Sequence, residues 1–152
     1  MSRWTTGVTV VTSKAGARIH GMTVSDFSGV SLSPPLVMVC AERSSITHGI
    51  IAEGKCFAVN VLAAGHESLS NRFASKKDEH RRFEGLELAT AVTGAPLIPG
   101  AVASWDCTLV ATHTAGDHDI YVGQVEELVT RDLEPLVYHA GAYRELAPAE
   151  TS

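Results

Sequence analysis

Hydroxyl side chains at the start of a predicted helix are the clearest candidates for binding chemistry in this chain. Ser44, Ser45 and Thr47 lie where Ile46 and Ile50 begin a helical apolar face that Gly54 ends. Unpaired N–H groups and the helix dipole make such a helix start favourable for an anion. Because the same hydroxyls also suit ordinary helix capping, the pattern predicts either an anion site or a capped helix.

A basic stretch follows in a second predicted helix, from His66 to about Arg81, in which Leu69 and Phe73 are spaced i, i+4. Such a run is usually a solvated helix face, diluted here by acidic residues. The alternative is that one or two of its charges contact phosphate groups. The cations are Arg72, Lys76, Lys77, Arg81 and Arg82.

Two more polar segments have both a structural and a functional interpretation. Gly21–Asp26 is either a strand end passing into a loop or a rim of amides and hydroxyls for a polar ring edge. Gly116-Asp117-His118 is predicted in a loop between two long strands, where His118 is either exposed and idle or a group that changes charge near neutral pH. Tyr143 is equally consistent with a binding residue and with a half-buried tyrosine.

Several familiar catalytic patterns are excluded. Gly49–Lys55 reads G-x-x-x-x-G-K, but Cys56 replaces the hydroxyl that would hold Mg²⁺ and no strand leads into the glycines. The seven histidines form no H-E-x-x-H pair, so we expect no metal site. No G-x-S-x-G elbow supports a serine hydrolase. The net charge of −5 argues against nucleic acid or an acidic membrane as partner.

Composition indicates one packed domain over residues 1–152, because 45% of residues are hydrophobic and only 19% are charged. No signal-peptide pattern follows Met1, and no apolar run is long enough to cross a bilayer. Cys40, Cys56 and Cys107 are odd in number and lie in apolar, strand-like runs, which favours reduced thiols. We therefore expect a cytoplasmic protein.

The elements that must position these residues are mostly short β-branched and apolar segments, which are typical of strands. Gly21–Ser25 and Gly29–Leu32 read as extended or looping, and Pro34-Pro35 excludes helix. Short connections between strands predict an antiparallel architecture that protects its edges. The first expected strand is 7–13, and a turn leads into a second strand that includes Ile19. The others are 36–41, 56–62, 102–113 and 119–129, and a final hairpin pairs 136–139 with 142–146.

Taken in order, four segments resemble the flavin reductase-like family, whose members form the FMN-binding split barrel. They are Thr6–Thr12, Gly21–Ser25, Ser31–Val37 and Gly116–Asp119, and the resemblance extends from Thr6 to Leu146. It implies a mainly β fold, an antiparallel Greek-key split β-barrel with a few short helices, which forms a homodimer with flavin near the interface. Family members usually carry a helix before the first strand, so we expect this chain to be shortened at its N-terminus.

The resemblance also implies site residues. It makes Arg72 the preferred phosphate cation, because the family places Phe73-Ala74 beside the flavin phosphate. Asp26 is expected to point away from the ring, since a carboxylate disfavours a flavin that becomes anionic. His118 matches the family's histidine at the nicotinamide site and is the single residue assigned to catalysis. The implied cofactor-binding residues are Thr23, Val24, Ser25, Asp26, Ser31, Leu32, Ser33, Cys40, Ala41, Ser44, Ser45, Thr47, Asn71, Arg72, Phe73, Ala74, His118 and Tyr143.

The implied activity is an NAD(P)H-dependent flavin reductase that transfers hydride to FMN, with FAD possible, and supplies reduced flavin to a monooxygenase. One alternative is a flavoprotein of the same fold that reduces another acceptor; a second is a flavin-binding carrier or sensor without catalysis. NADH and NADPH stay open, because Arg81 and Arg82 could contact a 2′-phosphate or be solvated.

Overall fold

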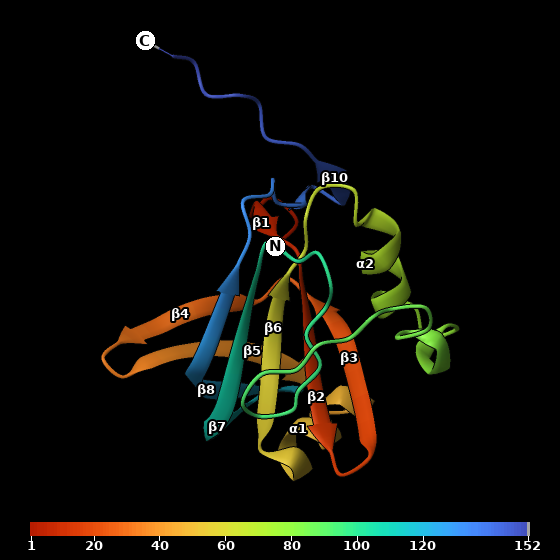
Figure 1. Cartoon of the computed structure of the whole chain (residues 1–152), viewed down its shortest axis with the longest axis vertical. Helices are drawn as coiled ribbons and strands as arrows, with labels where there is room; N and C mark the ends of the chain where they lie inside the picture. The colour runs from red at the N-terminus through yellow and green to blue at the C-terminus, as the bar shows by residue number, and fades with distance from the viewer. Residues whose placement is uncertain (152) are drawn as a thin grey trace.

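Strands form most of this molecule, for which a computed structural model describes residues 1–151 (Figure 1). The mainly β prediction is confirmed, and α1 begins and ends where its sequence signals place it. The elements are β1 (Thr6–Gly7), β2 (Thr9–Ala15), β3 (Arg18–Val24), β4 (Phe27–Leu32), β5 (Pro35–Glu42), α1 (Ile46–Gly54), β6 (Cys56–Val61), α2 (Glu67–Ala74), the 3₁₀ turn η1 (Glu79–Arg81), β7 (Ala103–Ala115), β8 (His118–Thr130), β9 (Val137–His139) and β10 (Ala142–Arg144).

The main sheet is antiparallel throughout, in the order β3-β2-β6-β7-β8-β5-β4. β6 follows α1 in the chain but pairs with β2 and β7, so the chain crosses over between the two halves of the sheet. The edge strands β3 and β4 are consecutive, and within residues 1–151 no ladder joins them, so the barrel is split there. β4 and β5 extend to one side as an arm (Figure 1).

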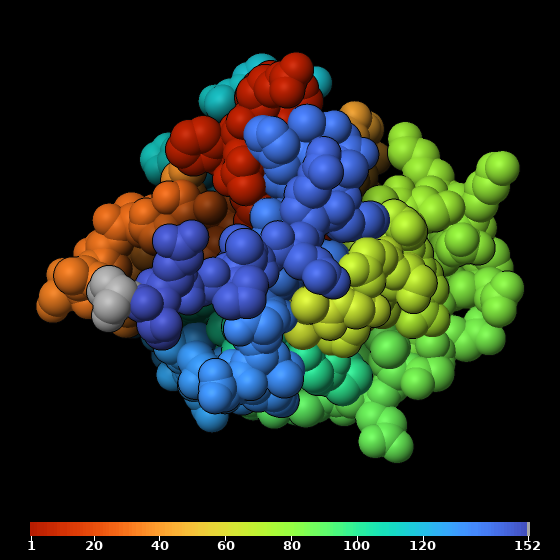
Figure 2. All heavy atoms as spheres, turned by 90° about the horizontal axis from the view of Figure 1, so that it is seen from above, coloured from red at the N-terminus to blue at the C-terminus, as the bar shows by residue number. Residues whose placement is uncertain are grey.

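A smaller sheet, β1-β9-β10, lies at one end of the barrel. Its hairpin between β9 and β10 turns at Ala140 and Gly141, which both have positive φ (50° and 79°) as a tight two-residue turn requires. From above, the N-terminal residues lie beside the C-terminal hairpin, with the β4–β5 arm on one side and the η1 region on the other (Figure 2).

The main core fills the barrel beneath α1. Alternate β5 residues Val37, Val39 and Ala41 are buried there, together with Phe57 and Tyr121. A second apolar cluster lies beneath α2, where Leu69 and Phe73 pack on β2 and on Leu136. The predicted i, i+4 face of this helix is therefore its buried face.

Two boundary predictions were wrong. The helix predicted from His66 to Arg81 ends at Ala74, because the apolar stripe ends at Phe73 and Phe83 folds back to contact it edge-on, with ring centroids 5.2 Å apart. Only Gly116-Asp117 turns between β7 and β8, so His118 begins a strand and does not lie in the loop. The extended structure expected for Gly21–Ser25 and Gly29–Leu32 is confirmed, since they lie in or at the ends of strands β3 and β4.

None of the helices described is long and apolar enough to cross a membrane. Over residues 1–151 no group of three or more His, Cys, Asp or Glu side chains could hold a metal ion. The three cysteines are free thiols, with Cys56 and Cys107 buried and Cys40 half-buried.

Candidate functional site

A cleft of about 310 Å³ opens between α1, β3 and the chain that follows α2; we call it the α1–α2 cleft. Three chain segments far apart in the sequence meet there, so it forms only in the folded barrel. Its lining residues are Met22, Thr23, Glu42, Ser44, Ser45, Ile46, Thr47, Phe73, Ala74, Lys76, Glu79 and Arg82.

The start of α1 forms one wall of this cleft. Ser45 is the N-cap residue, with extended backbone, and its hydroxyl accepts a hydrogen bond from the His48 N–H at 3.2 Å. The same hydroxyl donates to the Glu42 carbonyl at 2.7 Å, which fixes the turn between β5 and α1. Ser44 is exposed beside it, whereas Thr47 is fully buried beneath the wall. The helix start thus presents a positive dipole end toward the cleft.

Arg82 supplies a buried positive charge at the floor of the cleft. Its Nη1 donates to the Gly21 carbonyl at 2.8 Å and its Nη2 to the Ser75 carbonyl at 3.1 Å. Burial lowers the pKa of Arg82, but a guanidinium stays charged at neutral pH. Its Nε is buried and has no hydrogen-bond partner within residues 1–151. Such an orphaned N–H beside a helix start fits a missing anionic group.

A second cleft of about 250 Å³ adjoins the first, because both contain Thr23 and Ala74. We call it the β3–α2 cleft. The Tyr143 hydroxyl reaches across it, 2.9 Å from Ser70 Oγ and 2.8 Å from Asn71 Oδ1, while Thr23 donates to the Ser70 carbonyl at 2.6 Å. Its lining residues are Val8, Thr23, Ser25, Ser70, Asn71, Ala74, Tyr138 and Tyr143.

The two clefts bring together nine of the residues named from sequence, which are Thr23, Ser25, Ser44, Ser45, Thr47, Asn71, Phe73, Ala74 and Tyr143. The remaining residues lie elsewhere. Val24 and Ala41 are buried in the core. Ser31, Leu32 and Ser33 lie at the tip of the β4–β5 arm, where Leu32 is almost fully exposed.

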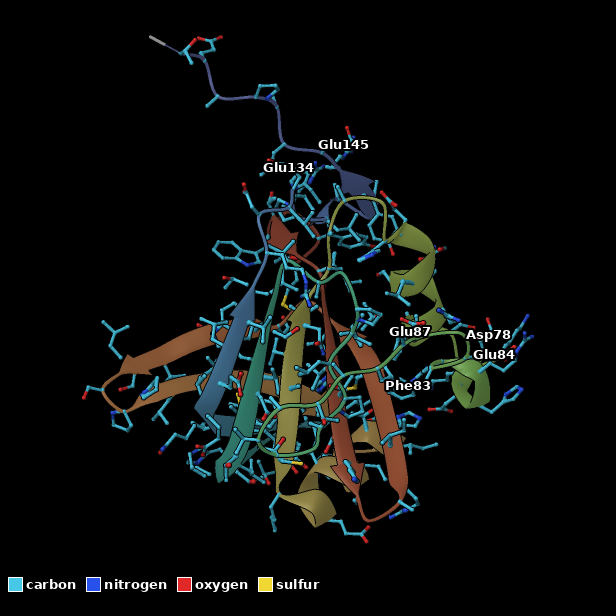
Figure 3. The ribbon with its side chains drawn as sticks, viewed as in Figure 1. Asp78, Phe83, Glu84, Glu87, Glu134 and Glu145 are labelled. Atoms are coloured by element: carbon cyan, nitrogen blue, oxygen red, sulfur yellow. The ribbon has the colours of Figure 1, made fainter. Side chains whose placement is uncertain are left out.

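Arg72 lies on a different face of α2 from the cleft. Its Nη1 donates to the Glu84 carbonyl at 2.8 Å, and it lines a separate polar hollow with Asp78 and Arg81. Arg81 is itself paired with the Glu84 carboxylate at 2.8 Å, and Asp78 and Glu84 surround η1 (Figure 3). The cations that face the α1–α2 cleft are therefore Lys76 and Arg82.

His118, Asp26 and Cys40 form a third group, at the ends of β8, β4 and β5. His118 lies opposite Glu42 in the sheet, and its Nδ1 is 2.7 Å from Asp117 Oδ1. The hydrogen bond with Asp117 raises the pKa of His118, and the charges of Asp117, Glu42 and Asp26 act in the same direction. Burial, and then the charge of Asp26, raise the pKa of the Cys40 thiol. The Asp26 carboxylate therefore lies close enough to influence both groups.

Sequence reasoning gave no role to several residues that line the clefts, including Met22, Glu42 and Tyr138, and left Lys76 and Arg82 without a defined place. The signal for Arg82 was its place in the basic stretch. The predicted helix to Arg81 did not place Arg82 in the cleft, because a continuous helix would have run past the cleft. The chain instead folds back under β3.

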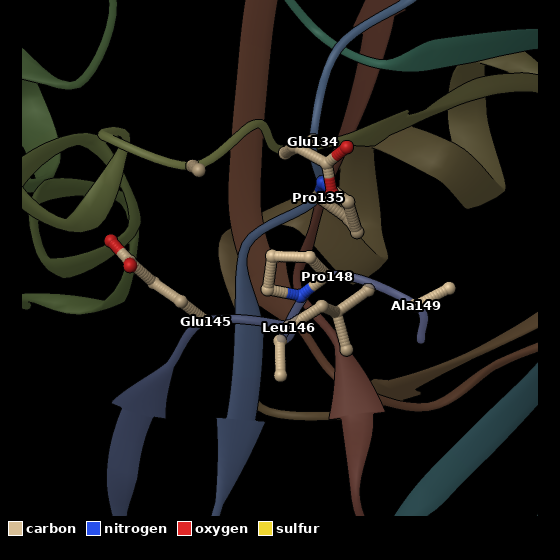
Figure 4. A pocket seen from close by; sticks show the side chains of 8 residues that line it. Glu134, Pro135, Glu145, Leu146, Pro148 and Ala149 are labelled. Atoms are coloured by element: carbon tan, nitrogen blue, oxygen red, sulfur yellow. The ribbon is translucent and has the colours of Figure 1, made fainter. Parts of the chain in front are cut away.

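A further hollow of about 500 Å³ lies beside the C-terminal segment, between Glu134–Pro135 and residues 145–149 (Figure 4). Its charged lining side chains are Glu134 and Glu145, and no cation lines it. Two carboxylates repel a phosphate, so this hollow does not suit an anionic ligand.

The fold is a split antiparallel barrel with an anion-suited cleft beside a helix start, and comparison with known proteins identifies its family. The model of the flavin reductase like domain matches residues 1–147, so the chain belongs to the flavin reductase-like family. It is 41% identical over 143 residues to the FMN reductase (NADH) SmoA of Agrobacterium fabrum, covering 94% of this chain and 80% of that protein.

Two other relatives extend the comparison. The reductase subunit HsaB of a flavin-dependent monooxygenase of Rhodococcus jostii is 32% identical over 152 residues, which is 99% of this chain and 77% of that protein. The structure of the Streptomyces globisporus NADH:FAD oxidoreductase SgcE6 in complex with NAD and FAD fragments matches with a TM-score of 0.89 and 36% identity, over 97% of this chain and 88% of the other.

Proposed function

We propose that this chain is an NAD(P)H-dependent flavin reductase that takes FMN, with FAD possible, and that the α1–α2 cleft holds the flavin phosphate. The observation that carries this placement is the buried, unpartnered Nε of Arg82 beside the start of α1. Ser44 and Lys76 are further donors that line the cleft, while Ser45, whose hydroxyl donates to the Glu42 carbonyl, and the buried Thr47 support the helix start.

The β3–α2 cleft continues from the phosphate end and suits the polar part of a flavin. Thr23, Ser25, Asn71 and Tyr143 supply hydroxyl and amide groups there, while Val8 and Ala74 close the apolar side. When bound, the flavin accepts hydride from the nicotinamide, and the chemistry belongs to these two molecules. The chain binds and orients them, and His118 lies at the edge where the dinucleotide would enter.

A homodimer is part of this proposal. In β5 and β8, Leu36, Met38, Cys40, Ile120 and Val122 alternate with the buried residues and are half-exposed. Met38 lies opposite Val122, and Cys40 lies opposite Ile120, so these side chains form one continuous outer apolar face. An antiparallel sheet that is apolar on both faces favours covering the second face, here by a second copy of the chain.

The dimer would also account for the residues that lie outside the clefts. Asp26 and Cys40 lie at one end of the outer apolar face, and Ser31–Ser33 lie on the projecting arm. A flavin ring placed at this interface could contact them, in addition to the polar groups that the two clefts of one chain supply. We further propose that reduced flavin is released to a partner monooxygenase, as the name of HsaB suggests for that relative. A cytoplasmic location is also part of the proposal, and the free thiols support it.

The test is NADH and NADPH consumption under air by the purified protein, with added FMN, with added FAD and without flavin. We expect NADH consumption that requires added flavin and saturates with it. Tight flavin that is never exchanged would favour the reduction of another acceptor. Binding of flavin without consumption of either dinucleotide would contradict the reductase and favour the carrier or sensor.

A further inference from the structure

Two buried nitrogen atoms beneath the α1–α2 cleft have no hydrogen-bond partner within residues 1–151. They are Nε2 of His20 and Nε of Arg82, in side chains that are only 12% and 6% exposed. Both residues approach the same carboxylate oxygen, since Glu79 Oε1 lies 3.4 Å from His20 Nε2 and 3.7 Å from Arg82 Nη1. Orphaned buried polar atoms are rare, and two of them in side chains that share one carboxylate indicate that the cluster is completed by something else.

His20 is connected to the cleft on both sides of its ring. Its Nδ1 lies 2.7 Å from the hydroxyl of Thr47, which is buried in the first turn of α1. Its Nε2 faces Glu79 of η1, so the ring links β3, α1 and η1. The charges acting on it are those of Glu79 and Arg82, and the other charged groups lining the cleft above are Glu42 of β5 and Lys76.

The surroundings of His20 favour the neutral imidazole. Burial lowers the pKa of His20, the charge of Arg82 lowers it further, and Glu79 opposes both. A neutral imidazole carries one proton for two nitrogen atoms: either Nδ1 donates to Thr47 and Nε2 faces Glu79 without a proton, or the Thr47 hydroxyl donates to Nδ1 and an uncharged Nε2–H faces Glu79. In either case no positive charge faces the Glu79 carboxylate, whereas an imidazolium would present a charged donor there.

A phosphate in the cleft changes this balance, because its negative charge compensates the cations of Arg82 and Lys76. On the basis of the proposed flavin site, we infer that binding of the phosphate end of FMN is coupled to proton uptake by His20, which acts as a positioning residue for the cleft. The imidazolium would hold the Glu79 carboxylate and the Thr47 hydroxyl. The Nε–H of Arg82, which has no partner within residues 1–151, would then donate to the phosphate while Nη1 and Nη2 keep their bonds to the Gly21 and Ser75 carbonyls.

The sign of the coupling follows directly. If bound FMN raises the pKa of His20, the complex carries more protons than the free protein, and binding tightens as the pH falls through the bound-state pKa. The phosphate of FMN also titrates, near pH 6, and this acts in the opposite direction. That contribution is common to all variants and cancels in a comparison between them.

The experiment measures proton uptake by calorimetry when FMN binds, at about pH 7, in buffers with different ionisation enthalpies. The proteins compared are wild type, His20→Asn and His20→Ala. The Asn amide reaches the position of Nδ1 and can bond to Thr47 but does not titrate, whereas Ala removes the contact. His113→Asn, on the exposed part of β7, is the matched control, and riboflavin is the ligand without a phosphate.

We expect more protons to be taken up by wild type and His113→Asn than by His20→Asn, and no such difference with riboflavin. The ratio of the Kd of His20→Asn to that of wild type should grow as the pH falls, by up to about tenfold for a rise of one pKa unit. His20→Ala should bind FMN more weakly at every pH, because Thr47 and α1 lose their support.

Equal proton uptake by wild type and His20→Asn, with FMN still bound more tightly than riboflavin, overturns the coupling and leaves the flavin site intact. Wild type that binds FMN no better than riboflavin overturns the phosphate placement and the coupling together. If His20→Asn does not fold, NMR titration of the wild-type imidazole decides: its pKa must rise with FMN and not with riboflavin, and an unchanged pKa overturns the inference.

Discussion

Arg82 Nη1 lies 2.8 Å from the carbonyl oxygen of Gly21, which ties the chain after α2 to the middle of β3. Gly21 packs closely there, since a Cβ at this position would lie 3.1 Å from Phe73, from Thr12 and from the Val11 carbonyl. The bond sets the floor of the α1–α2 cleft. It also places the guanidinium beside the start of α1, although Gly21, Arg82 and α1 are far apart in the sequence.

Replacement of Arg82 by Met should weaken FMN and spare riboflavin. The variant keeps the apolar stem but removes the charge and the donors to Gly21 and Ser75, so we expect a loss of roughly 2 kcal/mol in the free energy of unfolding. The Kd of FMN should rise about tenfold or more, because a charge-assisted contact is lost. Urea denaturation and quenching of flavin fluorescence measure the two effects. A parallel rise in the Kd of riboflavin would indicate general damage to the site.

Gly54 should tolerate no side chain. A Cβ there would lie 1.8 Å from the Lys14 carbonyl oxygen, so α1 would have to move away from β2. We expect Gly54→Ala to cost about 3 kcal/mol in the free energy of unfolding. Gly49→Ala in the same helix is the control, since nothing lies within 4 Å and Ala favours helix by roughly 0.5–1 kcal/mol. Chemical denaturation compares them, and equal stability of the two variants would refute the close approach.

His118→Ala should raise the KM for NADH about tenfold while kcat changes little, because His118 is proposed to contact the dinucleotide and not to transfer a proton. Steady-state kinetics with FMN at saturation measure both constants. A loss confined to kcat would instead assign His118 to the chemical step.

The contribution of His118 should depend on pH in one direction. Its pKa is raised, chiefly by the hydrogen bond with Asp117, so the imidazolium persists above the ordinary value of 6.5 and is lost as the pH rises further. The KM for NADH should therefore increase with pH through this raised pKa. Asp117→Asn removes the main cause, so its KM profile should shift to lower pH. Identical profiles would show that His118 does not act through its charge.

Val122→Glu should disrupt the homodimer, because it places a charge in the middle of the outer apolar face opposite Met38. Val92→Glu is the control: this side chain is 65% exposed on a loop away from that face. Light scattering should give the mass of one chain for Val122→Glu and twice that mass for wild type and Val92→Glu. A monomeric wild type would remove the dimer from the proposal.

Local signals predicted local structure well. Ser45 caps α1, and the helix ends at Gly54 as predicted, although the residue in the left-handed cap conformation is Lys55, whose N–H bonds to the Ile51 carbonyl. The turn at Ala140-Gly141 was equally readable. The end of α2 was readable in principle, since after Phe73 the next positions on the apolar face are Lys76 and Lys77.

The contacts that build the site were not readable from one sequence. Glu79 approaches His20 and Arg82 only because the chain leaves α2 at Ala74 and folds back under β3. Arg72 and Arg82 are chemically alike, and only the fold decides that Arg82 faces the cleft while Arg72 bonds to Glu84. The resemblance to the family predicted the chemistry, and the fold shows which of the two arginines faces the cleft.

The most direct test of the central claim is anaerobic mixing of the protein and FMN with NADH, while the absorbance of oxidised flavin is followed. We expect loss of this absorbance equal to the NADH consumed, and a slower rate when the transferred hydrogen of NADH is deuterium. Flavin that stays oxidised although it is bound would contradict the assignment as a flavin reductase.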